Sequence, residues 1–165
     1  MITIIAAIQS KDNGLGYNND LLYKLPEDQK FFRDATTRHV VIMGRKTWES
    51  IPEKFRPLPN RENIVITRQT DYVAHGAKVV SSLEEAIDLA QSNFPNREIF
   101  VIGGSEIYNQ ALPLTDKLLL TLIDGDKPAD VFFPEYTDLF TIIESGKETL
   151  SSSGPSFRFL ILEKK

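Results

Sequence analysis

Apolar residues along this chain form two kinds of pattern, short continuous runs and stripes with helical spacing. The runs are rich in Ile, Val and Leu, and they predict strands at residues 2–8, 39–43, 63–67, 77–80, 98–102, 117–123, 139–145 and 156–163. Helical spacing predicts helices at residues 26–35, 46–51, 83–92 and 105–111. Pro26 suits the first turn of a helix, and Ser82 and Ser105 are of the residue type that caps helix starts.

The order of these elements predicts the fold class. Strands and helices alternate over the first two thirds of the chain, which implies parallel pairing, whereas the last third is rich in strands and turns at Gly154-Pro155. We therefore expect one α/β domain over residues 1–165, with a single mixed, mainly parallel sheet of about eight strands and four helices on its two faces. Residues 11–24 are predicted to be a polar loop, either functional or a solvated connector, and residues 124–130 a second loop.

Composition narrows the class of protein. The 165 residues carry a net charge of −4 and form no basic stripe, so a nucleic-acid partner is not expected. The chain contains no Cys, which removes disulfides and thiolate metal sites, and no metal site is predicted. The first apolar run is too short to span a membrane. These features are typical of a cytoplasmic enzyme.

Three junctions between a strand and the following segment carry candidate binding chemistry. Gly44 ends an apolar run and is followed by Arg45, Lys46 and Thr47 at a helix start, where free backbone N–H groups attract anions. A second run ends at Gly103-Gly104, and a third ends at Arg68. Parallel strands place such junctions along one edge of a sheet, so the set suits a ligand with more than one phosphate. The alternative is that these are ordinary turns with solvated charges.

The helix predicted at residues 26–35 opens with two acids. Glu27 and Asp28 both complement the helix dipole, which is the common role of acids in a first turn. Asp28 shares its helix face with Phe31 and Phe32 at i+3 and i+4. It is therefore predicted to lie at the edge of an apolar pocket, where a carboxylate can bind a planar amidine-like group through two hydrogen bonds.

Six short segments in order resemble dihydrofolate reductase of the bacterial chromosomal type. They are Ile-Ile-Ala-Ala at 4–7, Leu-Pro-Glu-Asp at 25–28, Val-Ile-Met-Gly-Arg-Lys-Thr-Trp-Glu-Ser-Ile at 41–51, Arg-Pro-Leu-Pro-Asn-Arg at 56–61, Val-Ile-Gly-Gly at 101–104 and Phe-Pro at 133–134. The resemblance implies NADPH-dependent reduction of 7,8-dihydrofolate to tetrahydrofolate, with hydride passing from nicotinamide C4 to pterin C6 and a proton reaching N5 through water. It also implies antifolate binding, and we expect a monomer.

The resemblance also assigns roles to individual residues. The catalytic residues would be Asp28, Tyr23 and Leu21, with Asp28 holding the pterin 2-amino group and N3. The substrate-binding residues would be Ile5, Ala6, Ala7, Asp28, Phe32, Ile51, Leu58, Arg61, Ile102, Tyr108 and Thr121. The cofactor-binding residues would be Ala7, Leu15, Gly16, Gly44, Arg45, Lys46, Thr47, Thr67, Arg68, Ser82, Gly103, Gly104, Ser105, Glu106, Ile107 and Tyr108. In this family the two glycines at 103 and 104 are joined by a cis peptide.

One position departs from the family pattern. Leu22-Tyr23 stands where the family usually has Pro-Trp, and that tryptophan helps to hold an ordered water near the substrate. Tyr23 keeps a ring and a polar tip, so its hydroxyl is expected to anchor the water that serves N5. The alternatives are an NADPH-dependent reductase of another pterin-like or pyrimidine substrate, and a nucleotide-binding module without chemistry. The latter needs the phosphate junctions but not Asp28.

Overall fold

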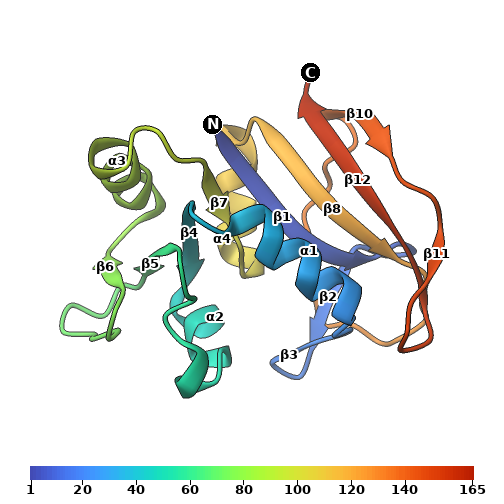
Figure 1. Ribbon diagram of the computed structural model, residues 1–165, viewed down its shortest axis with the longest axis horizontal. Helices are drawn as coiled ribbons and strands as arrows, with labels where there is room; N and C mark the ends of the chain where they lie inside the picture. Colours follow the sequence, from blue (N-terminus) through green and yellow to red (C-terminus); the bar gives the residue numbers. More distant parts are fainter.

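The computed structural model describes all residues from Met1 to Lys165 and is built on one sheet. Its main strands are β1 (Ile2–Gln9), β4 (Val40–Gly44), β5 (Glu62–Ile66), β6 (Lys78–Val80), β7 (Ile99–Val101), β8 (Lys117–Ile123), β10 (Phe140–Ser145) and β12 (Ser156–Lys164). They lie in the order β10-β12-β8-β1-β7-β4-β5-β6 (Figure 1). All eight predicted strands are confirmed, and no end differs by more than one residue.

The directions of these strands confirm the predicted mixed sheet. The six strands from β8 to β6 pair in parallel, and β12 and β10 add antiparallel pairs at the other edge. Four α-helices connect the strands, namely α1 (Pro26–Thr36), α2 (Arg45–Ser50), α3 (Leu83–Asn93) and α4 (Ser105–Ala111), and two short 3₁₀ turns follow at Glu53–Phe55 and Leu112–Leu114. The predicted α/β class with four helices is therefore correct. No helix has the length and apolar character needed to cross a membrane.

The two faces of the sheet bury different helices. Alternate residues of β1, such as Ile4 and Ile8, join a core cluster with residues of α3 and α4 on one face. Ile5 lies on the opposite face, in a cluster that includes Trp48 of α2 and is packed by Phe31 and Phe32 of α1. Figure 1 shows α1 in front of the sheet and α4 behind it. Successive residues of β1 thus serve opposite faces.

The segment from residue 11 to 24 differs from the predicted loop. It contains β2 (Gly14–Tyr17) and β3 (Asp20–Leu21), which form a hairpin, and β2 also pairs with β1 and with β9 (Val131–Phe132). The prediction of a plain loop was wrong because polar turn residues surround very short strands. Gly16 permits the close pairing, since a Cβ there would lie 2.6 Å from the carbonyl oxygen of Asp20. A further short strand, β11 (Thr149–Leu150), pairs with β12. Residues 124–130 form a loop, as predicted.

Candidate functional site

The predicted junctions share one edge of the sheet. In the parallel register Gly44 of β4 lies beside Ile66 of β5, and Ile66 lies beside Val80 of β6. The segments that follow these strand ends therefore lie next to one another, and they carry Arg45, Arg68 and Ser82. The neighbouring strand β7 leads into Gly103-Gly104, so the predicted common edge is confirmed.

The crossover connections diverge at the centre of this edge. From β1 the chain passes through α1 to β4 on one side, whereas from β7 it passes through α4 to β8 on the other side. A reversal of strand order of this kind opens a crevice at the carboxyl ends of the strands. Residues at the end of β1 and in the segment after β7, such as Ala7 and Ile102, therefore flank the crevice.

Bare backbone lines the meeting point of two junctions. The Gly44 N–H donates to the carbonyl oxygen of Gly103 at 2.9 Å, and the peptide between Gly103 and Gly104 is cis, as the resemblance implies. Gly103 has φ +128°, and a Cβ on it would lie 3.3 Å from the Tyr108 hydroxyl oxygen. A Cβ on Gly104 would meet only Thr47 Oγ1, at 3.6 Å. The two glycines thus leave a surface that side chains would otherwise fill.

Helix α4 begins at this backbone. Gly104 is its N-cap and Ser105 its first residue, so the prediction of Ser105 as the cap was wrong by one position. Ile107 is buried, and its Cγ1 would lie 3.2 Å from a Cβ built on Gly44. Glu106 is exposed and faces Arg68, with 3.8 Å between its Oε1 and Arg68 Nη2.

The cationic side chains at this sheet edge make only weak ion pairs or are exposed. Arg45 Nη1 donates to Glu49 Oε1 at 2.8 Å along α2, and Lys46 is exposed. Exposed ion pairs of this type contribute only about 0–1 kcal/mol, so their partners exchange readily for an anionic ligand. The other polar residues make local contacts: Thr67 Oγ1 accepts the N–H of Gln69 at 3.2 Å, and Ser82 Oγ accepts the N–H of Glu85 at 3.1 Å, which confirms Ser82 as the cap of α3.

A half-buried carboxylate lies on the α1 face. Thr121 Oγ1 of β8 donates to Asp28 Oδ1 at 2.6 Å, and Thr121 lies directly beside Ala7 of β1 in the parallel register. Burial raises the pKa of Asp28 above its ordinary value, and the hydrogen bond from Thr121 opposes this change. Asp28 forms no ion pair, so its charge is compensated only by hydrogen bonding.

Apolar side chains form the walls beside this carboxylate. One cluster contains Ile5 and is packed by the other predicted wall residues, which are Phe32, Ile51, Leu58 and Ile102. Tyr108 is buried, its hydroxyl donates to the Ile5 carbonyl oxygen at 3.0 Å, and burial together with the charge of Asp28 raises its pKa. The Ala6 side chain packs in the core on the opposite face, so Ala6 offers only backbone to the predicted pterin pocket.

Arg61 closes the far end of the wall. Its guanidinium lies 5.8 Å from the Phe32 ring centroid, Nε donates to the Pro59 carbonyl oxygen at 2.9 Å and Nη1 donates to Thr36 Oγ1 at 3.1 Å. Desolvation and the nearby charge of Arg33 lower the pKa of Arg61. These bonds use Nε and Nη1 and leave the Nη2 donors for a carboxylate.

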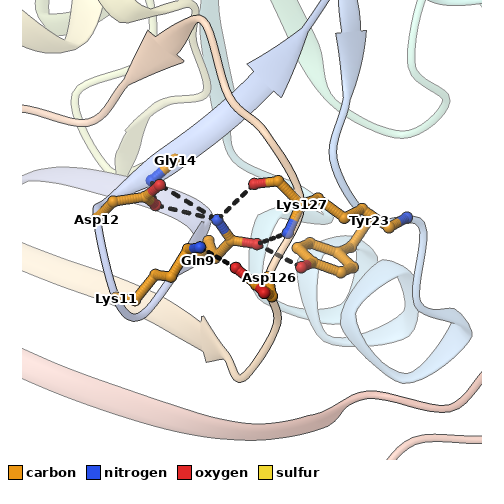
Figure 2. Close-up of polar contacts among 7 residues, drawn as sticks. All are labelled: Gln9, Lys11, Asp12, Gly14, Tyr23, Asp126 and Lys127. Atoms are coloured by element: carbon orange, nitrogen blue, oxygen red, sulfur yellow. Dashed lines mark hydrogen bonds and ion pairs between the residues drawn. The ribbon is translucent and has the colours of Figure 1, made fainter.

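Two buried polar residues near the site were not predicted from the sequence. The Asn63 side chain accepts the Leu58 N–H at 2.9 Å and donates to the Leu58 carbonyl oxygen at 3.0 Å, which fixes the segment that carries Arg61. Gln9 accepts the Tyr23 hydroxyl at 2.5 Å (Figure 2). Asn63 directly precedes one apolar run and Gln9 directly follows another. The available signal was a polar residue at a strand position that should be buried.

The hairpin brings the remaining predicted residues to the sheet. Leu15 and Gly16 are buried in β2, and Leu21 is exposed at the end of β3. Tyr23 packs with Ala7 against a cluster of Leu25, Ile123 and Phe157. Because the Tyr23 hydroxyl donates to Gln9, any water bound to that hydroxyl must donate its own proton.

The diverging crossovers, the bare glycines and the cations at one sheet edge define an α/β protein of the nucleotide-binding class. The family model for dihydrofolate reductase matches residues 1–164. The chain is 43% identical over 160 residues to the dihydrofolate reductase of Neisseria gonorrhoeae, covering 96% of this chain and 95% of that protein. It is 39% identical over 167 residues to that of Bacillus subtilis (strain 168), covering 100% and 95%. The chain therefore belongs to the dihydrofolate reductase family.

Proposed function

We propose that this protein reduces 7,8-dihydrofolate to 5,6,7,8-tetrahydrofolate with NADPH. The observation that carries the proposal is Asp28, a half-buried carboxylate that has no cationic partner and is bound only by Thr121. A carboxylate in an apolar pocket has free lone pairs, and a planar 2-amino-pyrimidinone edge offers two N–H donors in the matching geometry. Ile5, Phe32 and Leu58 supply apolar surface for the rest of such a ligand.

Asp28 acts in this proposal by orientation and charge. It holds the pterin 2-amino group and N3, and its negative charge favours protonation of the ring. Its own position is fixed by Thr121, at 2.6 Å. The proton for N5 comes from a water, because Asp28 binds the opposite edge of the ring. At the far end Arg61 pairs with the glutamate carboxylate through donors that are not used within the protein.

The sheet edge fits a nicotinamide dinucleotide. When bound, this group supplies the hydride, and the protein supplies position and electrostatics. Gly44, Gly103 and Gly104 present backbone without Cβ atoms, which suits close approach of the pyrophosphate and nicotinamide. Arg45, Lys46 and Arg68 favour the 2′-phosphate that distinguishes NADPH from NADH.

The assay for this function is NADPH oxidation, followed by the loss of its absorbance with and without dihydrofolate. Oxidation that depends on dihydrofolate supports the proposal. Oxidation only with another pterin or pyrimidine identifies the alternative reductase, and cofactor binding without oxidation identifies a non-catalytic module. We further propose that residues 1–165 act as one domain, as a cytoplasmic monomer that binds antifolate inhibitors in the Asp28 pocket. Sedimentation and inhibitor titration test the oligomeric state and the inhibitor site.

A further inference from the structure

A fully buried glutamine ends the strand that leads from the site to the loops. Gln9 is 0% exposed and lies on the same face of β1 as Ile5 and Ala7, which are four and two residues away. In the register of the sheet it lies beside Ile123 of β8, one side-chain repeat beyond the Ala7–Thr121 pair. A buried amide is unfavourable unless it is hydrogen-bonded, so this position needs an explanation.

Every polar atom of the Gln9 side chain is bonded (Figure 2). Nε2 donates to the Lys127 carbonyl oxygen at 3.0 Å and to the two carboxylate oxygens of Asp12 at 3.1 and 3.3 Å. Oε1 accepts the Lys127 N–H at 2.9 Å and the Tyr23 hydroxyl at 2.5 Å. One side chain thus joins β1, the segment before β2, the loop at residues 124–130 and the segment before α1.

Tyr23 contacts residues of the loop at 124–130 on one side and borders a surface cavity on another. A Cβ on Gly125 would lie 1.7 Å from the Tyr23 hydroxyl oxygen, so the tyrosine occupies space that a side chain at 125 would fill. Lys127 Nζ lies 4.6 Å from the Tyr23 ring centroid and donates to the Leu22 carbonyl oxygen at 2.9 Å. Elsewhere Tyr23 borders a surface cavity of about 430 Å³. Because Tyr23 borders this cavity, the bond from its hydroxyl to Gln9 adds to the contacts that orient the ring.

The position of the Tyr23 ring bears on the carboxylate. Tyr23 packs against Leu25, which is the N-cap of α1 and lies three residues before Asp28. The same cluster contains Ile123, two residues beyond Thr121 on β8. A rotated Tyr23 ring therefore disturbs the start of the helix and the strand that together hold the Asp28–Thr121 hydrogen bond.

We propose that Gln9 is a positioning residue for the reduction, acting through the Tyr23 hydroxyl. Gln9 touches neither substrate nor cofactor in this proposal; it fixes the ring that supports the start of α1 and borders the path of water to the substrate. The inference rests on the proposed reductase function. The proposed role of Gln9 is distinct from simply holding two loops together. Lys11 and Asp126 form an exposed ion pair between the same two loops, but neither contacts the Tyr23 hydroxyl.

The test is a double-mutant cycle on the full chain with Gln9→Met, Tyr23→Phe and the double variant. Methionine resembles glutamine in shape and removes the acceptor and donors. We expect Gln9→Met to slow the single-turnover hydride step with NADPH and dihydrofolate about 10-fold, the scale of one lost hydrogen bond. In the Tyr23→Phe background Gln9→Met should change the rate less than about 2-fold, because the bond through which it acts is already absent.

The matched control is Asp126→Asn, which breaks the neighbouring ion pair and should change the rate less than about 2-fold. Thermal unfolding is measured for every variant, since a purely structural role of Gln9 lowers the midpoint without affecting the hydride step. A wild-type rate in Gln9→Met, or effects of the two changes that multiply, would overturn the proposal. If Gln9→Met does not fold, Tyr23→Phe breaks the same bond from the other side, and a wild-type rate in it overturns the proposal equally. A wild-type protein that does not reduce dihydrofolate refutes the proposed function instead.

Discussion

The most informative perturbation of this protein is Asp28→Asn. The substitution keeps the shape of the side chain, and the amide oxygen still accepts the hydroxyl of Thr121, which donates to Asp28 Oδ1 at 2.6 Å. It removes the negative charge and replaces the second acceptor oxygen by a donor. A ligand edge that presents two N–H groups then finds at most one acceptor, and a protonated ring loses its counter-charge.

The magnitude follows from the two bonds that the carboxylate offers. Hydrogen bonds to a charged group contribute about 1.5–3 kcal/mol and neutral bonds about 0.5–1.5 kcal/mol. Losing the charge assistance of two bonds therefore removes about 2–3 kcal/mol. Since 1.36 kcal/mol corresponds to a tenfold change in rate, turnover at neutral pH should fall by roughly 10²-fold. Asp28 is half-buried, and its partial desolvation weakens the screening of its charge by water, so the loss of that charge is felt strongly.

The assay is turnover of NADPH and dihydrofolate across a pH series. Activity of Asp28→Asn should recover partly at low pH, where the substrate gains its proton without assistance. Glu27→Gln is the matched control: it removes a charge from the adjacent residue of α1, but Glu27 accepts from the Ser152 N–H at 2.8 Å, and glutamine keeps an acceptor for that bond. Near-wild-type turnover of Asp28→Asn at pH 7, or equal losses in both variants, would refute the assignment of Asp28.

Three further predictions follow from the same geometry. Burial places the pKa of Asp28 in the folded state above 3.8, so its ionisation destabilises the fold above that raised pKa; Asp28→Asn should unfold at a higher temperature than wild type at pH 7, with the gap narrowing as pH falls towards 3.8. Changing Arg45 and Arg68 together to Ala should weaken NADPH binding, by about 1.5–3 kcal/mol per lost charge-assisted bond, far more than NADH binding; equal losses by titration would contradict a role with the 2′-phosphate. Gly104→Ala should remain folded, since its Cβ meets only Thr47 Oγ1 at 3.6 Å, but should lose most of its activity, and full activity would exclude close approach of the cofactor to this backbone.

Local patterns predicted the main elements because each of them is long or well marked. Continuous apolar runs gave β1, β4 and β8, and Pro26 and Ser82 marked the starts of α1 and α3. The short strands of the hairpin could not be predicted, since β3 has only two residues and β2 depends on pairing with β1 and β9. Such short strands are stabilised by pairing with their neighbours, of which β9 is distant in sequence, and no periodicity within two to four residues reveals them.

The sequence predicted where several site residues lie, but not which side chains they contact. Helical spacing placed Asp28 beside Phe31 and Phe32, and strand ends placed the glycine junctions on one edge. The partner of Asp28 was another matter: Thr121 lies 93 residues away in sequence, and only the family resemblance indicated it. The contact of the Tyr23 hydroxyl was missed, because Gln9 lies just beyond the strand predicted at residues 2–8 and was assigned no role.

Strand β1 shows how a polar residue at the end of an apolar run can contact the site without disturbing the core. Ile4, Ala6 and Ile8 pack into the core with α3 and α4, so they must be apolar whatever the function. The alternate positions face the α1 side, where Ile5 and Ala7 border the predicted pocket and Gln9 meets the loops. Because a strand alternates its faces, the core fixes every second residue and leaves the others free to serve the site. A substitution on the site face, such as one at Gln9, can therefore alter the reaction without removing a residue from the main core.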